Sequence, residues 1–390
     1  MTNITLFGQI IYELDRPLFN KIVSAFQSDK YSKGINSWTH LVSMLFCNFS
    51  RATSLREITN GLLSIENNLV HLGIANKCPK RSSLSYINKN RTSELFKEYY
   101  LKLFEKFSIG ETFKMKHSRI RKKLYLLDSS IVTLSLSLFD WARYSHTKGA
   151  IKIHTLLDYE GCLPNFVLIT DGKVGDATAA KLIDIPSNSV VVADRAYASF
   201  ELLSQWDKKA IKFVVRIKES TQFVRFKERE LPKEKWEEIL IDEIVLLENA
   251  NTRSKYSKKL RRVVVYDKKK DIIIELITNN FNWTAETISE LYKCRWQIES
   301  FFKEIKNHVR IKTFVGTSSN AVEIQIWTAL ITMLILRYLK SISKYGWCLS
   351  NLIAFLRMNL FVKIDLYHWL HYPFKPPGKE IDTIQYRIFE

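Results

Sequence analysis

The sequence has little that would support a disulfide framework, a zinc site or a membrane anchor. Its five cysteines are scattered without a C-x-x-C pair, so we interpret them as free thiols in a reducing compartment. His368 and His371 have no glutamate between them, which excludes the common zinc-protease motif. The N-terminus lacks a basic segment followed by an apolar core, and the longest apolar run, Ile326 to Leu336, is too short to span a bilayer. We therefore expect a cytoplasmic protein without membrane contact.

Acidic residues are also few relative to basic ones. The chain has 59 Lys and Arg against 40 Asp and Glu, which gives a net charge of +19 and a pI of about 9.5. Such an excess favours a polyanionic partner, because each neutralised phosphate releases condensed counterions. A chain of 390 residues is long enough for two or three domains. Composition alone therefore favours a nucleic-acid-binding protein.

Residues 1–115 read as helical and basic. Apolar residues recur at helical spacing over 37–49 and 92–107, and the stretch 81–91 is rich in Ser, Asn and basic residues. A helix-turn-helix-like DNA reader would have this character. A plain helical bundle with a solvated basic face explains the same pattern equally well.

From residue 123 the pattern changes to strands alternating with helices, which predicts an α/β protein with a mixed sheet. The expected strands are 124–128, 151–157, 165–170, 189–194 and 211–217, and the expected helices are 177–185 and 199–208. Residues 219–277 are highly charged with β-rich runs at 239–247, 262–266 and 272–278, which we interpret as an insertion. One long helix is then expected from Thr284, its N-cap, to His308.

Two acidic residues stand at the ends of apolar strands. Asp128 follows Leu124–Leu127 and Asp194 follows Ser189–Ala193. Ligands of open α/β sheets gather at the carboxyl ends of strands, so these two carboxylates are candidates for one site. For either residue alone, a turn or helix-cap role is the more common explanation.

The expected helix carries a third carboxylate in a polar stripe. At 100° per residue, five polar side chains share an arc of roughly 80°; they are Tyr292, Arg295, Glu299, Lys303 and Lys306. A solvated stripe stabilised by Glu299–Lys303 pairing is the ordinary interpretation of this pattern. Together with Asp128 and Asp194, however, Glu299 would complete a site for two metal ions that catalyse phosphoryl transfer. Arg295 and Lys306 would then hold DNA phosphates.

These residues resemble a known family. The spacing Tyr292-x2-Arg295-x3-Glu299-x6-Lys306 is similar to the Tyr-Arg-Glu-Lys signature of bacterial insertion-sequence transposases of the Asp-Asp-Glu class, the group named after insertion sequence four. The blocks Leu127-Asp128-Ser129-Ser130 and Ala193-Asp194-Arg195-Ala196-Tyr197 resemble the first two catalytic blocks. Residues 7–71 resemble a helical domain that often precedes such catalytic cores.

The resemblance implies an RNase H-like core, a mixed five-stranded sheet flanked by helices. We expect an N-terminal helical, DNA-binding domain (1–115), a catalytic domain (116–345) interrupted by the β-rich insertion at about 219–277, and a C-terminal segment (346–390) that could equally serve core packing or a dimer contact. The resemblance implies two Mg²⁺ ions, replaceable by Mn²⁺, held by Asp128, Asp194 and Glu299. The residues expected to contact DNA are Tyr292, Arg295, Lys303, Lys306 and Arg195.

The implied activity is cut-and-paste transposition by a homodimer in the bacterial cytoplasm, associated with the nucleoid. Hydrolysis at the terminal inverted repeats of double-stranded DNA would precede transfer of the 3′-hydroxyl into target DNA. Some members form a hairpin and hold a flipped base with a Trp on the strand before the signature helix. The expected strand 271–278 has no Trp, which leaves Trp236 and Trp283 as substitutes.

Two other functions remain open from the residues alone. Another RNase H-like metal nuclease would share the three carboxylates but would not need the Tyr292–Lys306 stripe or the insertion. A domesticated, non-catalytic DNA-binding protein would use the basic surface alone. Such a protein gains nothing from carboxylates that repel phosphates, so the acidic residues favour an enzyme.

Overall fold

A computed structural model describes residues 3–32, 34–74, 77–108, 121–135, 139–142, 149–231, 238–308 and 314–375. The chain forms two compact units. The first combines Met1–Tyr99 with Ile331–Glu390, and the second is Tyr100–Leu330. Trp236 therefore lies outside the described residues, whereas the three candidate carboxylates all lie in the second unit.

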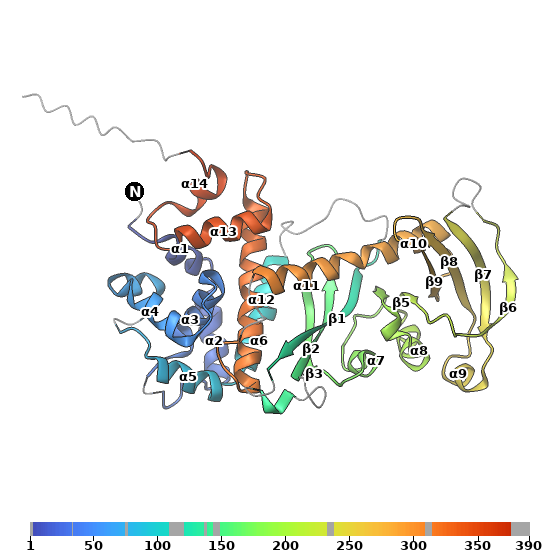
Figure 1. The fold of residues 1–390 in the computed structure, drawn as a ribbon, viewed down its shortest axis with the longest axis horizontal. Coiled ribbons are helices and arrows are strands. Elements are labelled where there is room, and N and C mark those ends of the chain that lie inside the picture. Colours follow the sequence, from blue (N-terminus) through green and yellow to red (C-terminus); the bar gives the residue numbers. More distant parts are fainter. Residues whose placement is uncertain are drawn as a thin grey trace, which may run out of the picture. The chain divides into compact units, whose positions relative to one another are not determined.

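The first unit is helical (Figure 1). Its elements are α1 (Leu6–Tyr12), α2 (Arg16–Ala25), α3 (Ser37–Ser50), α4 (Leu55–Leu63), η1 (Glu66–Leu72), α5 (Arg81–Asn90), α13 (Leu349–Asn359) and α14 (Leu366–His371), with parts of α6 (Glu94–Ser108) and α12 (Ser319–Ile342). Helix α3 lies at its centre, since every residue from Ser37 to Phe49 is buried, and the Asn36 side chain caps it by accepting a hydrogen bond from the Thr39 N–H. The helices expected at 37–49 and 92–107 are present as α3 and α6.

The C-terminal helices of this unit pack on its N-terminal residues. The backbone N–H groups of Leu6 and Phe7 donate to the carbonyls of Val362 and Leu360 at 2.9 and 2.8 Å. The rings of Phe46 and Phe361 stack with centroids 5.7 Å apart. The described part of the C-terminal segment thus contributes to the core of the first unit.

The second unit is built on one nine-stranded mixed sheet of order β3-β2-β1-β4-β5-β9-β8-β7-β6. Its strands are β1 (Leu124–Leu134), β2 (Gly149–Asp158), β3 (Leu163–Asp171), β4 (Val190–Ala193), β5 (Lys212–Arg216), β6 (Phe223–Glu228), β7 (Ile239–Leu247), β8 (Leu260–Asp267) and β9 (Ile272–Thr278). The strand β1 is antiparallel to β2 and parallel to β4, which in turn is parallel to β5. The α/β class with a mixed sheet is therefore confirmed.

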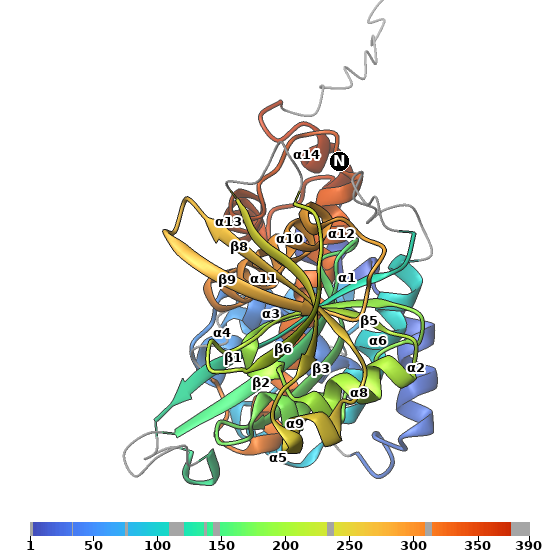
Figure 2. The same ribbon diagram turned by 90° about the vertical axis from the view of Figure 1, so that its right-hand side faces the viewer.

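The β-rich insertion expected at 219–277 continues the core sheet. Strand β9 pairs with β5 in antiparallel fashion, so the insertion strands extend the five expected strands to nine. This pairing supplies hydrogen-bond partners for the N–H and C=O groups along the edge of β5, which would otherwise be unpaired. The strands fan about a common axis in Figure 2, as expected for a twisted sheet.

Helices cover both faces of the sheet (Figure 1). On one side lie α7 (Asp176–Ala180) and α8 (Phe200–Lys208), with the 3-10 turn η4 (Arg195–Tyr197) and the short helix α9 (Ala250–Lys255). On the other side lie α10 (Ala285–Cys294) and α11 (Trp296–His308). Helix α7 is shorter than the predicted 177–185. Among the described residues, α12 is long and apolar enough to cross a membrane, but 83% of its most apolar window is buried in the protein, as in a core helix.

Candidate active site

The sheet places Asp128 and Asp194 side by side. Parallel pairing of β1 with β4 runs to Leu127 and Ala193; Asp128 is the next residue of β1, and Asp194 directly follows β4. The sequence predicted that β1 ends at Asp128, which is wrong: β1 continues to Leu134 because it keeps its pairing with β2. It is the pairing with β4 that stops, and this leaves one edge of β1 open at Asp128.

Glu299 reaches the same place from a helix that differs from the expected one. The single helix predicted from Thr284 to His308 is interrupted at Arg295, between α10 and α11. The Arg295 N–H bonds the Tyr292 carbonyl, and the Ile298 N–H bonds the Arg295 carbonyl, both at 3.1 Å. These bonds span three residues instead of four, so the chain tightens locally between two α-helices.

Arg295 joins the carboxylates at this junction. Its Nη1 atom donates to Oδ2 of Asp128 at 3.1 Å, and its Nη2 atom donates to Oε1 of Glu299 at 2.7 Å. The hydroxyl of Tyr292 donates to Oδ1 of Asp194 at 3.2 Å. Tyr292 is 7% exposed, so its hydroxyl is held toward the sheet. Tyr292 and Arg295 thus bind the three predicted carboxylates in the structure.

The carboxylates influence one another electrostatically. Burial raises the pKa of Asp128 to about 6, and the negative charges of Asp194 and Glu299 add to this rise. The Ser129 backbone N–H and the Arg295 guanidinium oppose it. Burial alone would lower the pKa of Arg295, but its anionic neighbours outweigh that effect and raise it. The site therefore has an excess of negative charge that a cation would offset.

The donor set fits a hard divalent cation. All three acidic side chains offer only oxygen atoms, which Mg²⁺ and Mn²⁺ prefer, and each is at least partly accessible. Within the described ranges, however, no three His, Cys, Asp or Glu side chains are close enough to form a closed ligand set. Arg295 lies between two of the carboxylates instead and donates a hydrogen bond to each of them.

A groove of about 460 Å³ opens beside these residues. It is lined by Asp128, Ser129, Ser130, Glu299, Phe302, Lys303, Lys306 and Asn307. Lys303 is exposed, and Lys306 is held at the rim by a 2.9 Å hydrogen bond from its Nζ atom to the Ile131 carbonyl. Arg195 is exposed on η4, and its side chain makes no hydrogen bond or ion pair with the described residues. Both lysines are thus placed in one cleft with two of the carboxylates.

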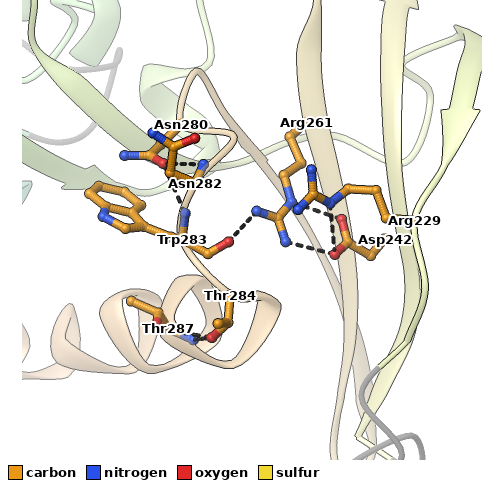
Figure 3. A network of polar contacts seen from close by, with 8 residues as sticks. All are labelled: Arg229, Asp242, Arg261, Asn280, Asn282, Trp283, Thr284 and Thr287. Atoms are coloured by element: carbon orange, nitrogen blue, oxygen red, sulfur yellow. Dashed lines mark hydrogen bonds and ion pairs between the residues drawn. The ribbon is translucent and has the colours of Figure 1, made fainter.

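The insertion strands fix the start of the helix pair (Figure 3). Arg261 on β8 is 1% exposed and forms a two-pronged ion pair with Asp242 on β7, at 2.8 and 2.6 Å. Its Nη1 atom also donates to the backbone carbonyl of Trp283, directly before the Thr284 N-cap of α10. A buried arginine thereby ties the insertion to the helix that carries Tyr292.

Comparison with known proteins places this arrangement in a family. A model described as "Transposase DDE domain" matches residues 119–335, more than half of the chain. The chain belongs to the DDE transposase family. A second model, described as a domain of unknown function, matches residues 2–75 of this DDE-family chain.

Several curated proteins are similar to this DDE-family chain. "Probable transposase for insertion sequence element IS5377" of Geobacillus stearothermophilus is 30% identical over 57% of the chain and 58% of its own length. "Putative transposase y4zB" of Sinorhizobium fredii is 29% identical over 66% of the chain and 71% of its own length. "Putative transposase for insertion sequence element IS4SA" of Synechocystis is 25% identical over 74% of the chain and 80% of its own length. The chain thus spans less than two thirds of the Geobacillus relative.

A solved piggyBac transposase synaptic complex with hairpin DNA aligns with a TM-score of 0.38 and 10% identity, over 91% of this chain and 78% of that one. At this level the likeness supports no argument. The sequence prediction of a bacterial insertion-sequence transposase of the Asp-Asp-Glu class is confirmed by the family match and the curated relatives.

Proposed function

We propose that this DDE-family chain catalyses cut-and-paste transposition of an insertion sequence. Hydrolysis would occur at the terminal inverted repeats, followed by transfer of the 3′-hydroxyl into target DNA. The observation that carries the proposal is the convergence of Asp128, Asp194 and Glu299 on Arg295 and Tyr292. The strand order β3-β2-β1-β4-β5 supports an RNase H-like core around these residues.

Asp128, Asp194 and Glu299 would hold two Mg²⁺ ions, for which Mn²⁺ would substitute. When bound, such ions activate a water or a 3′-hydroxyl and stabilise the leaving oxygen of phosphoryl transfer. The protein contributes a rigid sheet that fixes both aspartates and a helix that brings Glu299 to them. Arg295, released from the carboxylates, would bind a DNA phosphate beside the cleaved bond.

The remaining candidate DNA contacts differ in accessibility. Lys303 and Lys306 line the groove and are suited to hold the backbone phosphates that lead into the site. Arg195 is exposed next to Asp194 and would contact the same strand. Tyr292 is buried against Asp194, which favours a role in holding that carboxylate over a direct DNA contact.

Within the proposed N-terminal DNA-binding domain, α5 is the element best suited to read a duplex. Leu84 is fully buried, and Oδ1 of Asn88 lies 2.6 Å from Nε2 of His40, so one face is anchored. The opposite face exposes Arg81, Ser82, Ser85, Tyr86, Lys89 and Asn90, and no residue of α5 is acidic. A groove of about 790 Å³ runs beside it. An α-helix fits the major groove, where Ser and Asn meet base edges and basic side chains meet phosphates.

The proposal includes a homodimer on paired transposon ends, with residues 346–390 as a candidate dimer contact and the nucleoid as its place in the cell. A hairpin intermediate has less support. Trp283 is half-buried, and the described strand before α10, β9, carries no Trp to receive a flipped base.

The test is cleavage of a labelled duplex that carries the inverted repeat flanking the gene, in Mg²⁺ or in Ca²⁺. Wild-type protein is expected to nick at the repeat boundary in Mg²⁺, and Glu299→Gln is expected to abolish nicking while DNA affinity persists. Glu304→Gln, a carboxylate on the same helix outside the site, is the matched control and should nick as wild type does. DNA binding without nicking by wild-type protein would contradict the proposal, and nicking by Glu299→Gln would exclude Glu299 as a ligand.

A further inference from the structure

A buried polar cluster lies on the face of the sheet opposite Asp128. Residues directly paired across two antiparallel strands share a face, and the register pairs Asp128 with Thr155 but Ser129 with His154. Ser129 and His154 therefore face the side covered by α7, whose first residue is Asp176. The Oδ1 atom of Asp176 accepts a hydrogen bond of 2.6 Å from the Ser129 hydroxyl. It also lies 3.4 Å from Nδ1 of His154.

Asp176 is itself held firmly. The Nζ atom of Lys152 lies 3.5 Å from the carboxylate and donates to the Val174 carbonyl at 3.0 Å. The side chains of Lys152 and Asp176 are only 12% and 18% exposed. His154 is fully buried, which lowers its pKa to about 4, so it stays neutral and contacts the Thr170 hydroxyl at 3.0 Å. One charged lysine thus balances one carboxylate, and that carboxylate has a fixed orientation.

Ser129 connects this cluster to the candidate site. Its backbone N–H donates to Oδ1 of Asp128 at 2.8 Å, while its hydroxyl donates to Asp176 on the other face. At this position β1 has lost its neighbour β4, because the pairing stops at Leu127 and Ala193. The orientation of the Ser129 peptide is therefore not fixed by a strand on both sides, and the side-chain bond to Asp176 supplies the missing restraint.

We propose that Asp176 is a positioning residue for Asp128. By holding Ser129, it aims the Ser129 N–H at one oxygen of Asp128 and leaves the other oxygen turned toward Arg295 and the groove. The inference rests on the proposed role of Asp128 as a metal ligand. Groups that orient a metal ligand typically change metal affinity or activity by about 10- to 100-fold when removed.

The experiment compares Ser129→Ala, Asp176→Asn and the double variant by calorimetric Mn²⁺ titration of the DNA-free protein. Ser129→Ala is the central variant, because it leaves the Asp176–Lys152 pair intact and does not endanger folding. We expect its Mn²⁺ affinity and nicking rate to fall about 10-fold, with DNA affinity and melting temperature unchanged. The double variant should lose no more than the more impaired single variant, because both substitutions break one link.

Asp176→Asn retains a side-chain oxygen that can accept a hydrogen bond from the Ser129 hydroxyl. Its Mn²⁺ affinity should therefore fall less than that of Asp176→Ala. Thr133→Val is the matched control, since it removes an exposed hydroxyl from the same strand. Wild-type Mn²⁺ affinity in Ser129→Ala would overturn the proposal. A second outcome would also overturn the proposal: Asp176→Asn loses Mn²⁺ binding completely while Ser129→Ala keeps the wild-type affinity. Asp176 would then itself be a metal ligand.

A different result would contradict the proposed function itself. In that case, Asp128→Asn would leave the Mn²⁺ affinity unchanged. Amide exchange of Ser129, followed by NMR on protein labelled with ¹⁵N-serine, needs neither metal nor DNA. We expect faster exchange of this amide in Asp176→Ala than in wild type. Unchanged exchange would show that Asp176 does not hold Ser129, whatever the role of Asp128.

Discussion

Nη1 of Arg295 lies 3.1 Å from Oδ2 of Asp128, and the same guanidinium bonds Glu299 one turn further along the chain. The positive charge of the arginine thus partly offsets the negative charges of two carboxylates whose mutual repulsion contributes to the raised pKa of Asp128. A cation that binds those oxygens must displace the guanidinium. Under the proposed role of Asp128 and Glu299 as metal ligands, Arg295 and the metal ion would compete for these oxygens in the DNA-free protein.

Arg295→Gln should consequently bind Mn²⁺ several-fold more tightly than wild type when no DNA is present, because the competing positive charge is gone. Its nicking rate should nevertheless fall, since no guanidinium is left to hold a phosphate. Calorimetry measures the first effect and the labelled-duplex assay the second. Arg225→Gln, an exposed arginine on β6, is the control. Weaker Mn²⁺ binding by Arg295→Gln would contradict the competition.

Strands rich in apolar residues could be predicted closely from the sequence. The expected bounds 239–247 and 272–278 are those of β7 and β9, because polar residues flank each run. Strand β6 was missed, since it is an edge strand whose residues from Val224 to Glu228 are exposed and mostly charged. Strand β6 forms by pairing with β7, and the local sequence of β6 does not indicate that pairing.

The three carboxylates could be proposed from the sequence because each follows a recognisable local pattern. The interruption of the helix at Arg295 could not be predicted, because no Gly or Pro lies there and the surrounding residues favour a helix. Asp176 could not be singled out either. Only the register of β1 on β2, with α7 above it, brings Asp176 to Ser129.

The buried ion pair of Asp242 and Arg261 gives a prediction about stability. Asp242→Ala leaves a guanidinium that is 1% exposed without its carboxylate, which typically costs about 3–5 kcal/mol. The free energy of unfolding in urea should fall by that amount. Glu228→Ala breaks the exposed Arg225–Glu228 pair on β6 and should cost less than about 1 kcal/mol. Similar losses for both variants would mean that Arg261 is solvated when its partner is absent.

The exposed face of α5 gives a prediction about DNA binding. Arg81→Ala combined with Lys89→Ala should weaken binding and lower the slope of log affinity against log salt by about 1.8, if each side chain neutralises one phosphate. Fluorescence anisotropy of a terminal-repeat duplex at several salt concentrations measures the slope. Lys21→Ala with Lys363→Ala removes the same charge from other exposed positions of the first unit. An equal loss in that control would assign the effect to net charge and not to α5.

His40 makes the first unit sensitive to acid. Burial lowers its pKa to about 3, and the positive charge of Arg91 adds to this, so folded His40 stays neutral while the unfolded chain takes up a proton below about pH 6.5. Stability is then complete above pH 6.5 and declines as the pH falls toward 3, by at most about 1.4 kcal/mol per pH unit. His40→Gln should show a flatter decline between pH 6.5 and 4.5 in urea unfolding, although it loses stability at neutral pH with the Asn88 contact. His368→Gln, which replaces a half-exposed histidine on α14, is the matched substitution for comparison. An unchanged slope in His40→Gln would show that His40 is protonated in the folded protein.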